Sequence, residues 1–425
     1  MNEELRHSES HPAPKPTPVK GKRWLSILKF VGLGLAGGIG IALSIFLFLF
    51  SQDYFLQQRE IWFIFDNGAS GGVGHPGQDL EDGILAAIQE YAQFFREKRI
   101  LLKVFSDNGD PKTAQKLAKE AVENDKVIAV VGHLSSSIMS DVSGLYLDSK
   151  LPVIMPVPTN PKFTKDALSA NKNFIRMPPT DDIQAQVARD FMFDHHAQRI
   201  AVIEDADNST YSEYLGRKFI SEMRRASVQP GGPRIVYVST VGGSMGKEFI
   251  PPVLTDLNVD TVFFAGSTDN ALTFVEALLA VRPPGKMPTI LMSDGIVDSK
   301  FLARLSDVPP ELYVTFPLSD ETRNGRCAGH FVLSYCPYGY DSVEILKQIV
   351  AETAPNVADN LWSKHYYNYT RSDFLNFFND KLKSERPFEL RGYFNKSYRF
   401  DKLGDNSSFR FSVWHADPKR EFVKG

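Results

Sequence analysis

The chain has 425 residues, of which 43% are hydrophobic and 23% charged, and its formal net charge at pH 7 is −3. This length suggests two or three domain-sized units, and the composition is ordinary for a folded protein. The small negative charge gives no reason to expect a nucleic-acid partner. Two cysteines, Cys327 and Cys336, exclude a disulfide-rich scaffold and a four-thiolate zinc site.

The N-terminal part predicts a tail followed by a membrane anchor. Residues 1–29 are polar, proline-containing and basic, and we expect a disordered cytoplasmic tail. Residues 30–52 carry no charge and are long enough to cross a bilayer as a helix. The run ends in Phe46–Phe50, which offers no small residues for signal-peptide cleavage. We therefore expect one uncleaved transmembrane signal anchor with a cytoplasmic N-terminus, and a C-terminal region that is periplasmic or extracellular.

Beyond residue 57, short apolar strands alternate with amphipathic helices in two successive series. In the first, the pattern predicts strands at 61–65, 100–105, 127–131 and 152–155, with helices at 78–95 and 111–124 and a further helix after 135. In the second, it predicts strands at 200–203, 235–238, 261–265 and 289–292, with helices at 181–195, 211–225, 249–257 and 270–281. Such alternation indicates an α/β fold whose parallel sheets are covered on both faces.

The remaining part predicts a return strand at 313–316 and a long helix at 339–351. We expect the tail to form a β ribbon, with strands at 392–400 and 409–414 joined by a turn at 404–406. Two series of βα units and one shared tail suggest two similar lobes.

The stretch from Val127 to Pro161 carries the first functional signal. The predicted strand 127–131 is followed by three serines where a helix would begin, and serine is a preferred N-cap. The next strand ends in a polar turn at residues 157–160. Ligands of open α/β sheets bind outside the carboxyl ends of the strands, so both turns can offer hydroxyl and N–H groups to an anion.

Motifs for catalysis or cofactors are weak. Gly242–Gly246 matches GxSxG around Ser244, but no His or Asp lies in a setting that would complete a hydrolase triad. No zinc-protease, P-loop or CxxC motif is present. We therefore expect no enzyme, no metal site and no cofactor. Cys327 and Cys336 lie close in sequence, and either a local disulfide or two buried thiols is compatible with that spacing.

Taken together, the motifs resemble those of type I periplasmic solute-binding proteins, in particular the leucine/isoleucine/valine-binding proteins of branched-chain amino acid ABC transporters. The resemblance covers about residues 61–423. It is carried by the order and spacing of many short matches, and the turn VVGHLSSS closely matches the family's IGHxxS turn. The matched segments are 130–137, Tyr146, 156–161, Ser70-Gly71, Asp110-Pro111, 174–176 with Asp181, Tyr211, 263–266, Asp294-Gly295, Tyr340-Asp341 and 400–405.

The resemblance implies two Rossmann-like lobes that close on an amino acid. It places lobe 1 at about 59–176 and 316–390, and lobe 2 at about 177–315 and 391–425, within a ligand-binding region of 57–425. By position, Ser136 and Thr159 would hold the ligand carboxylate, and Val157 would offer its carbonyl to the ammonium. The second lobe would contribute Tyr211, Ser267 and Asp294, with Asp294 pairing with the ammonium. Ser267 departs from the family, which often has an aromatic residue there.

These expectations combine into one functional hypothesis. The chain would be a membrane-anchored extracytoplasmic protein that captures an amino acid or similar small polar ligand and delivers it to an ABC permease. The alternative is a ligand-sensing receptor subunit of the same fold with no transport role. Gly34 and Gly38 form a GxxxG pattern that can pair membrane helices, which suits a receptor.

Overall fold

The structure is a computed structural model. It describes Ser44 and residues 58–68, 76–170, 172–226, 232–242, 250–281, 287–298, 300–318, 325–327, 333–354, 369–384 and 386–424. The expected tail at 1–29 and, except for Ser44, the expected anchor at 30–52 lie outside these residues, as do Ser244 and most of its motif. No helix among the described residues is long and apolar enough to cross a membrane.

The first lobe is built on a parallel sheet with strand order β2-β1-β3-β4-β5. Alternate residues of β1 face opposite sides: Phe63 belongs to one hydrophobic cluster, and Trp62 and Ile64 belong to another. Both faces are therefore buried, as the alternating sequence pattern predicts. The strands are β1 (Arg59–Phe65), β2 (Ile100–Ser106), β3 (Val127–Gly132), β4 (Val153–Met155) and β5 (Phe174–Arg176).

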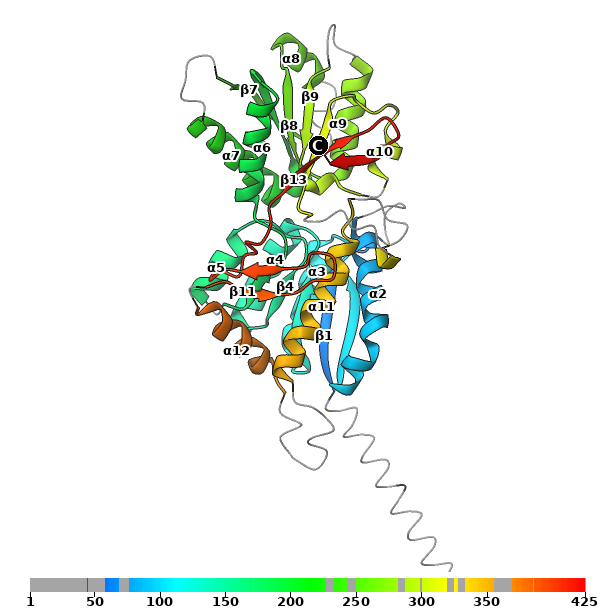
Figure 1. Cartoon of the computed structure of the whole chain (residues 1–425), viewed down its shortest axis with the longest axis vertical. Helices are drawn as coiled ribbons and strands as arrows, with labels where there is room; N and C mark the ends of the chain where they lie inside the picture. The colour runs from blue at the N-terminus through cyan, green and yellow to red at the C-terminus, as the bar shows by residue number, and fades with distance from the viewer. Residues whose placement is uncertain are drawn as a thin grey trace, which may run out of the picture. The chain divides into compact units, whose positions relative to one another are not determined.

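Four helices connect these strands, and two later ones return to them (Figure 1). The long helix α11 packs against α2 so closely that a Cβ on Gly83 would lie 2.0 Å from the carbonyl oxygen of Cys336. Only glycine permits that approach. The helices are α2 (Pro76–Glu97), α3 (Pro111–Glu123), α4 (Ser136–Asp148), α5 (Lys162–Ala170), α11 (Cys336–Thr353) and α12 (Arg371–Leu382).

The second lobe has a seven-stranded sheet with order β14-β13-β10-β9-β8-β6-β7. Its first five strands in sequence are parallel, and β13 and β14 join antiparallel beside β10. They are β6 (Arg199–Asp205), β7 (Arg234–Val241), β8 (Thr261–Ala265), β9 (Thr289–Met292), β10 (Leu312–Phe316), β13 (Ser412–Ala416) and β14 (Phe422–Lys424).

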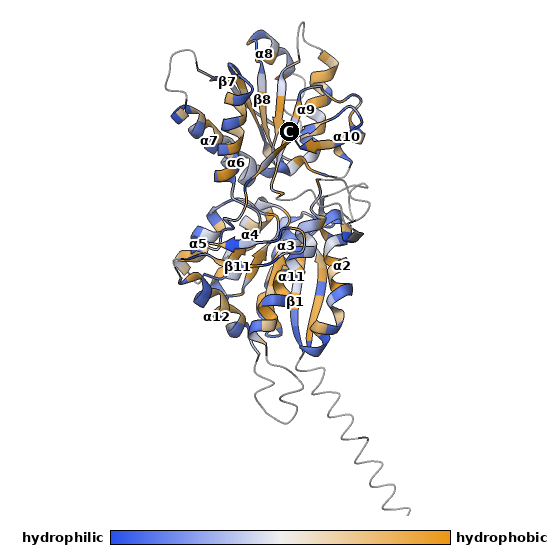
Figure 2. Ribbon diagram, viewed as in Figure 1, coloured by the Kyte–Doolittle hydropathy of each residue, from blue (hydrophilic) through white to orange (hydrophobic). Residues whose placement is uncertain are grey.

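Helices accompany this sheet as well, and those of both lobes carry hydrophobic and hydrophilic residues on different sides (Figure 2). They are α6 (Asp181–Asp194), α7 (Ser209–Ala226), α8 (Ile250–Asp256), α9 (Thr268–Val281) and α10 (Phe301–Arg304), with short 3-10 turns η1 (Ala206–Asn208), η2 (Asp294–Ile296) and η3 (Gly325–Cys327).

The predicted C-terminal turn forms, with an antiparallel bridge between Phe400 and Asn406, but the predicted pairing of the two ribbon strands is wrong. Strand β12 (Tyr398–Phe400) pairs with β11 (Phe388–Leu390), and β13 pairs with β10 instead. Residues 391–406, which we expected in lobe 2, contact lobe 1: the Asp341 carboxylate of α11 accepts hydrogen bonds from the backbone N–H groups of residues 393–395. Because the buried Asp341 carboxylate accepts several hydrogen bonds from this segment, it holds the segment against lobe 1 more strongly than pairing within a local ribbon would.

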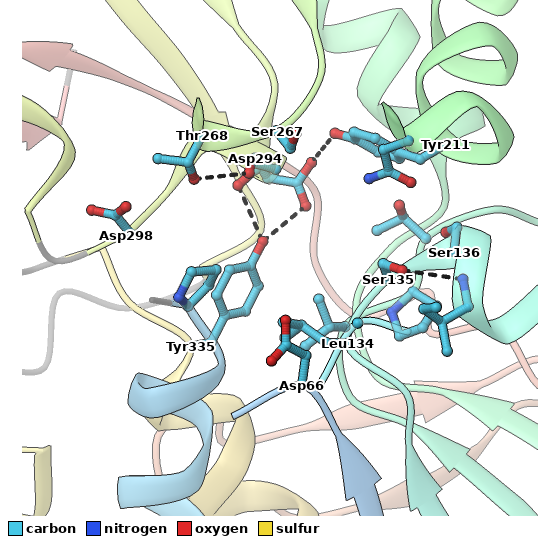
Figure 3. Close-up of a pocket in the computed structure, with 18 of the residues that line it drawn as sticks. Asp66, Leu134, Ser135, Ser136, Tyr211, Ser267, Thr268, Asp294, Asp298 and Tyr335 are labelled. Carbon is cyan, nitrogen blue, oxygen red and sulfur yellow. Dashed lines mark hydrogen bonds between the residues drawn. The ribbon is translucent and has the colours of Figure 1, made fainter. Parts of the chain in front are cut away.

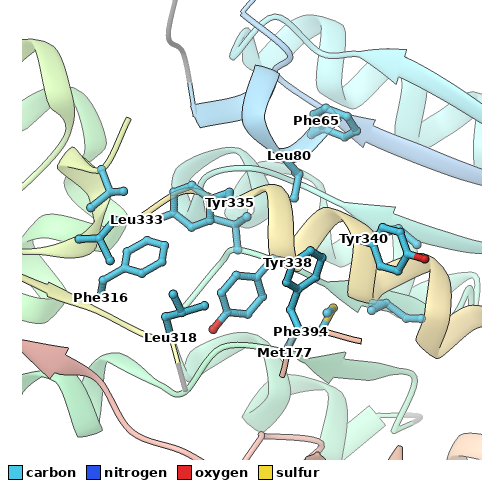
Figure 4. Close-up of a cluster of buried hydrophobic side chains, with 14 of the residues drawn as sticks. Phe65, Leu80, Met177, Phe316, Leu318, Leu333, Tyr335, Tyr338, Tyr340 and Phe394 are labelled. Atoms are coloured by element: carbon cyan, nitrogen blue, oxygen red, sulfur yellow. The ribbon is translucent and has the colours of Figure 1, made fainter. Parts of the chain in front are cut away.

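Cys327 and Cys336 form a disulfide, with Cα atoms 5.9 Å apart. The segment between β10 and α11 is one of the crossings between the lobes. Its described ends carry a cluster of buried side chains, including Phe316, Leu318, Leu333 and Tyr338 (Figure 4). The Tyr338 hydroxyl donates a hydrogen bond to the Pro317 carbonyl. This crossing is therefore fixed to the start of α11 by packing, hydrogen bonding and a covalent link.

Candidate functional site: a cavity between the two lobes

A cavity of about 320 Å³ lies where the carboxyl ends of the strands of both lobes meet (Figure 3). This is the position at which open α/β sheets bind ligands. All six residues that we singled out from the sequence line it: Ser136, Val157, Thr159, Tyr211, Ser267 and Asp294. The structure therefore brings together residues that lie up to about 160 positions apart in the chain.

One wall is the N-terminus of α4. The Ser135 hydroxyl caps the helix by accepting a hydrogen bond from the Ile138 N–H (3.2 Å). The N–H groups of the first turn have no partner within a helix, and they carry the positive end of its dipole. Ser136 is the first helical residue and is 3% exposed. This wall can accept an anionic group.

The adjacent wall is the turn after β4, and a buried arginine shapes it. The guanidinium of Arg176 donates to the carbonyls of Pro158 (3.1 Å) and Asn160 (2.7 Å). The Thr159 carbonyl accepts from the Asp181 N–H (3.0 Å). Within the described part of the chain, the Val157 carbonyl accepts no hydrogen bond. The turn therefore leaves one acceptor for a ligand donor.

Asp294 forms the opposite side, at the start of η2 after β9. Its Oδ1 accepts hydrogen bonds from the Tyr211 hydroxyl (2.6 Å) and from Gln184 Nε2 (2.7 Å). The Tyr335 hydroxyl donates to its backbone carbonyl (3.1 Å) and lies 3.5 Å from Oδ2. Burial raises the pKa of the Asp294 carboxyl, and the hydrogen bonds from Tyr211 and Gln184 oppose that rise. A cationic ligand group beside Asp294 would stabilise its charged carboxylate and so offset the cost of burying that charge.

Ser267 lines the cavity, but its hydroxyl donates to the Asp205 carboxylate, which also accepts from the Ser267 N–H (2.8 Å). Asp205 is fully buried and accepts further hydrogen bonds from the Asn270 amide and the Asp207 N–H. The Ser267 proton is thus engaged within lobe 2. Its oxygen can still accept a hydrogen bond.

Sequence reasoning missed several lining residues. Tyr335 comes from the crossing before α11, and Asp298 and Arg304 follow η2. Asp66 and Asp107 stand directly after β1 and β2, so the rule that ligands bind at carboxyl ends would have found both. Nothing in the local sequence marks Tyr335, Asp298 or Arg304.

Among the described residues, no group of three or more His, Cys, Asp or Glu side chains could hold a metal ion. The cavity instead combines hydroxyl and N–H donors, one open carbonyl and a buried carboxylate. Such a set binds a small polar molecule without covalent chemistry. The fold is that of a two-lobed binding protein, and this cavity lies between its lobes.

Comparison with known proteins gives the same class. Residues 67–309, more than half of the chain, match the periplasmic binding protein family, and the chain belongs to that family. The family consists of binding proteins rather than enzymes, and membership implies an extracytoplasmic location. The resemblance deduced from the motifs is confirmed.

Curated relatives are similar at modest identity. An amino acid binding protein of Pseudomonas aeruginosa is 29% identical over 47% of this chain and 50% of its own length. A Leu/Ile/Val-binding protein of Rhizobium johnstonii is 24% identical over 55% and 61%. The chain thus spans only half to about three fifths of these two. A leucine-, isoleucine-, valine-, threonine- and alanine-binding protein of P. aeruginosa is 24% identical over 84% and 90%.

Solved structures share the fold. A leucine binding protein of Thermotoga maritima has a TM-score of 0.69 at 18% identity, covering 86% of this chain and 97% of its own. A branched-chain amino acid transporter substrate-binding protein of Streptococcus pneumoniae, in complex with isoleucine, has a TM-score of 0.66 at 15% identity, covering 87% and 100%. A solute-binding protein of R. palustris, in complex with benzoate, has a TM-score of 0.66 at 14% identity, covering 86% and 94%.

Proposed function

We propose that this chain captures a small amino acid or a related carboxylate by closure of its two lobes, for uptake by an ABC permease. The observation that supports this most is the cavity's polarity: the α4 N-terminus suits a carboxylate, and Asp294 across the cavity suits an ammonium. Relatives solved with isoleucine and with benzoate hold ligands that share a carboxylate.

In this proposal Ser136 and Thr159 bind the ligand carboxylate, and the Val157 carbonyl and Asp294 receive its ammonium. Tyr211 and Ser267 line the second-lobe side, with Tyr211 holding the Asp294 carboxylate in place. Ligand contacts to both lobes stabilise the closed state over the open one, and closure follows from that difference in affinity.

The test is calorimetric titration of the full chain in detergent with a panel of amino acids and benzoate. We expect at least one amino acid to bind, and Asp294→Asn to weaken it by about tenfold or more, because a charge-assisted hydrogen bond becomes neutral. Asp380→Asn, whose side chain is 74% exposed on α12, is the matched control. Equal affinity in Asp294→Asn and wild type would refute the ammonium assignment.

The membrane anchor at 30–52 is part of the same proposal and rests on the sequence alone. An uncleaved anchor would leave the protein in the membrane fraction after alkaline extraction, and residues before 30 would be protected from external protease in whole cells. Release into the soluble fraction would contradict it.

A receptor subunit is the second candidate, favoured by the uncleaved anchor and the Gly34/Gly38 pattern. Deleting the gene should abolish uptake of the radiolabelled ligand if the permease is the partner. Normal uptake with a lost transcriptional or kinase response to the ligand would favour the receptor.

A further inference from the structure

Asp181 is a buried acid beside the cavity to which the proposed function gives no role. It is the first residue of α6, and its side chain is fully buried. Its N–H donates to the Thr159 carbonyl (3.0 Å), and its carboxyl group interacts with the Thr159 side chain. Thr159 lines the cavity. Asp181 therefore lies directly behind a residue that we propose to bind the ligand carboxylate.

The first turn of α6 also reaches the other side of the cavity. Gln184, three residues after Asp181, donates to Asp294 Oδ1 (2.7 Å) and to the Thr315 hydroxyl (2.8 Å). The negative charge of Asp294 acts on Asp181 within this buried region, where water screens little. Two carboxyl groups so placed repel each other when both are ionised. One of them is therefore favoured to keep its proton.

Asp181 is the better candidate to keep it. The Asp294 carboxylate accepts hydrogen bonds from side chains of α6 and α7, which stabilise its charge (Figure 3). The Thr159 side chain and the Arg176 charge favour ionisation of Asp181, but Arg176 is bonded to Asp405 (2.8 Å). Burial raises the pKa of Asp181 to about 8, and the Asp294 charge adds to the rise.

The charged and titratable side chains that act on Asp181 come from four elements. They are Asp294 of η2, Arg176 of β5, Asp182 of α6, and Tyr211 and Tyr214 of α7. Asp182 is paired with Lys218 (3.3 Å). Within the described residues, Asp294 has no cationic partner. Its charge is the one that a cationic ligand group would compensate.

We propose that binding of an α-ammonium at Asp294 releases a proton from Asp181, so that ligand affinity rises with pH. This rests on the proposed function, which places the ammonium at Asp294. The ammonium compensates the negative charge that disfavours ionisation of Asp181. The O–H bond of the Asp181 carboxyl group then breaks, and its proton passes to solvent. The coupling is reciprocal: the Asp181 carboxylate that remains attracts the ammonium.

The test is calorimetric titration of the full chain in detergent at pH 7, repeated in buffers that differ in their enthalpy of ionisation. The probes are L-leucine, L-threonine, L-lysine and L-glutamate. For each one that binds, we expect release of about half a proton or more, and an affinity about tenfold higher at pH 8 than at pH 6. Binding without proton release would overturn the inference and leave the amino-acid function standing. If none of the four binds, both proposals fail.

Asp181→Asn distinguishes Asp181 from Asp294, whose carboxyl group can also titrate. The amide keeps the size of the side chain but has no ionisable proton. We expect proton release to disappear, and affinity to change by less than about threefold between pH 6 and pH 8. Asp190→Asn, an exposed change on the same helix, should release protons as wild type does.

Release that persists in Asp181→Asn would assign the proton to another group and overturn the proposal. Asp181→Ser is the second variant, in case Asp181→Asn fails to fold, and the same loss of proton release is expected from it.

Discussion

Arg176 shows how a buried charge can shape a binding site that it does not line. Its side chain is fully buried, and it binds the Asp405 carboxylate (2.8 Å) and the Thr164 hydroxyl (2.8 Å) besides two carbonyls of the turn after β4. Planar, forked donors suit this arrangement, and a lysine could not replace them. The sequence marked residues 174–176 through the resemblance but gave no sign of these contacts, because Asp405 is remote in sequence.

Asp181 is the residue with the clearest consequence for pH. It is fully buried, and burial raises its pKa to about 8, with the Thr159 side chain opposing the rise and the Asp294 charge adding to it. The folded state therefore keeps a proton that the unfolded chain has released above about pH 4. Its contribution to stability is present at low pH and is lost as pH rises toward about 8.

We predict that Asp181→Asn gains stability relative to wild type as pH rises from 5 to 8, because the amide does not titrate. The relative gain in unfolding free energy should exceed about 2 kcal/mol over this window. Urea denaturation at several pH values measures it. Asp190→Asn, an exposed change on the same helix, is the control. If the difference in unfolding free energy between Asp181→Asn and wild type stayed constant from pH 5 to 8, Asp181 would already be ionised in the folded protein at pH 5.

At the scale of elements, the alternating pattern predicted the strands of both sheets well where strands were apolar and flanked by turns. It missed the strands β5, β11 and β14 and the helices α5, α10 and α12. The strand β5 has three residues, and α5 and α12 carry polar residues on much of their surface. The ribbon was mispaired because β13 finds its partner β10 about a hundred residues away. Such pairing depends on tertiary contacts that local patterns do not contain.

The connection from β10 to α11 carries both the disulfide and Tyr335, which lines the cavity. Arg326 pairs with Glu90 of α2 (2.6 Å), its guanidinium lies 3.9 Å from the Tyr393 ring centroid, and the neighbouring Cys327 is bonded to Cys336. Tyr335, which contacts Asp294, directly precedes Cys336. The disulfide thus links Tyr335, through Cys336 and Cys327, to the neighbouring Arg326, and Arg326 pairs with α2.

We predict that the double variant Cys327→Ser/Cys336→Ser loses about 2–3 kcal/mol of stability, the amount expected for a short closed loop, and also binds ligand more weakly. Thermal melts and calorimetry under non-reducing conditions measure both effects. Reductant should bring wild type to the level of the variant. A wild type that titrates two free thiols without reductant would contradict the prediction.

For the whole molecule, the six residues that family spacing singled out all line one cavity. Their roles depend on neighbours that spacing does not reveal: Ser267 is occupied by Asp205, and Tyr335 approaches from a distant crossing. The lobes also contact each other directly beside the cavity. The Ser137 hydroxyl of α4 donates to Asn208 of η1 (2.8 Å), and the Asn160 amide donates to the Thr210 carbonyl (2.8 Å).

We predict that Ser137→Ala lowers ligand affinity about fivefold, because a hydrogen bond of about 1 kcal/mol that favours the closed lobes is lost. Ser143→Ala on the same helix, whose hydroxyl bonds within α4, is the control. Calorimetry measures affinity, and X-ray scattering measures closure. An unchanged affinity would mean that this contact persists in the open form.

The folded unit begins in one lobe and ends in the other: β1 starts at Arg59 in the first sheet, and β14 ends at Lys424 in the second. In the proposed function, lobe closure would therefore change the separation between residue 58, just before the first strand of the folded unit, and residue 424, at the end of its last strand. A pair of fluorescent proteins placed before residue 58 and after residue 425 would report closure as energy transfer. The same protein would then serve as an optical sensor of its own ligand in living cells.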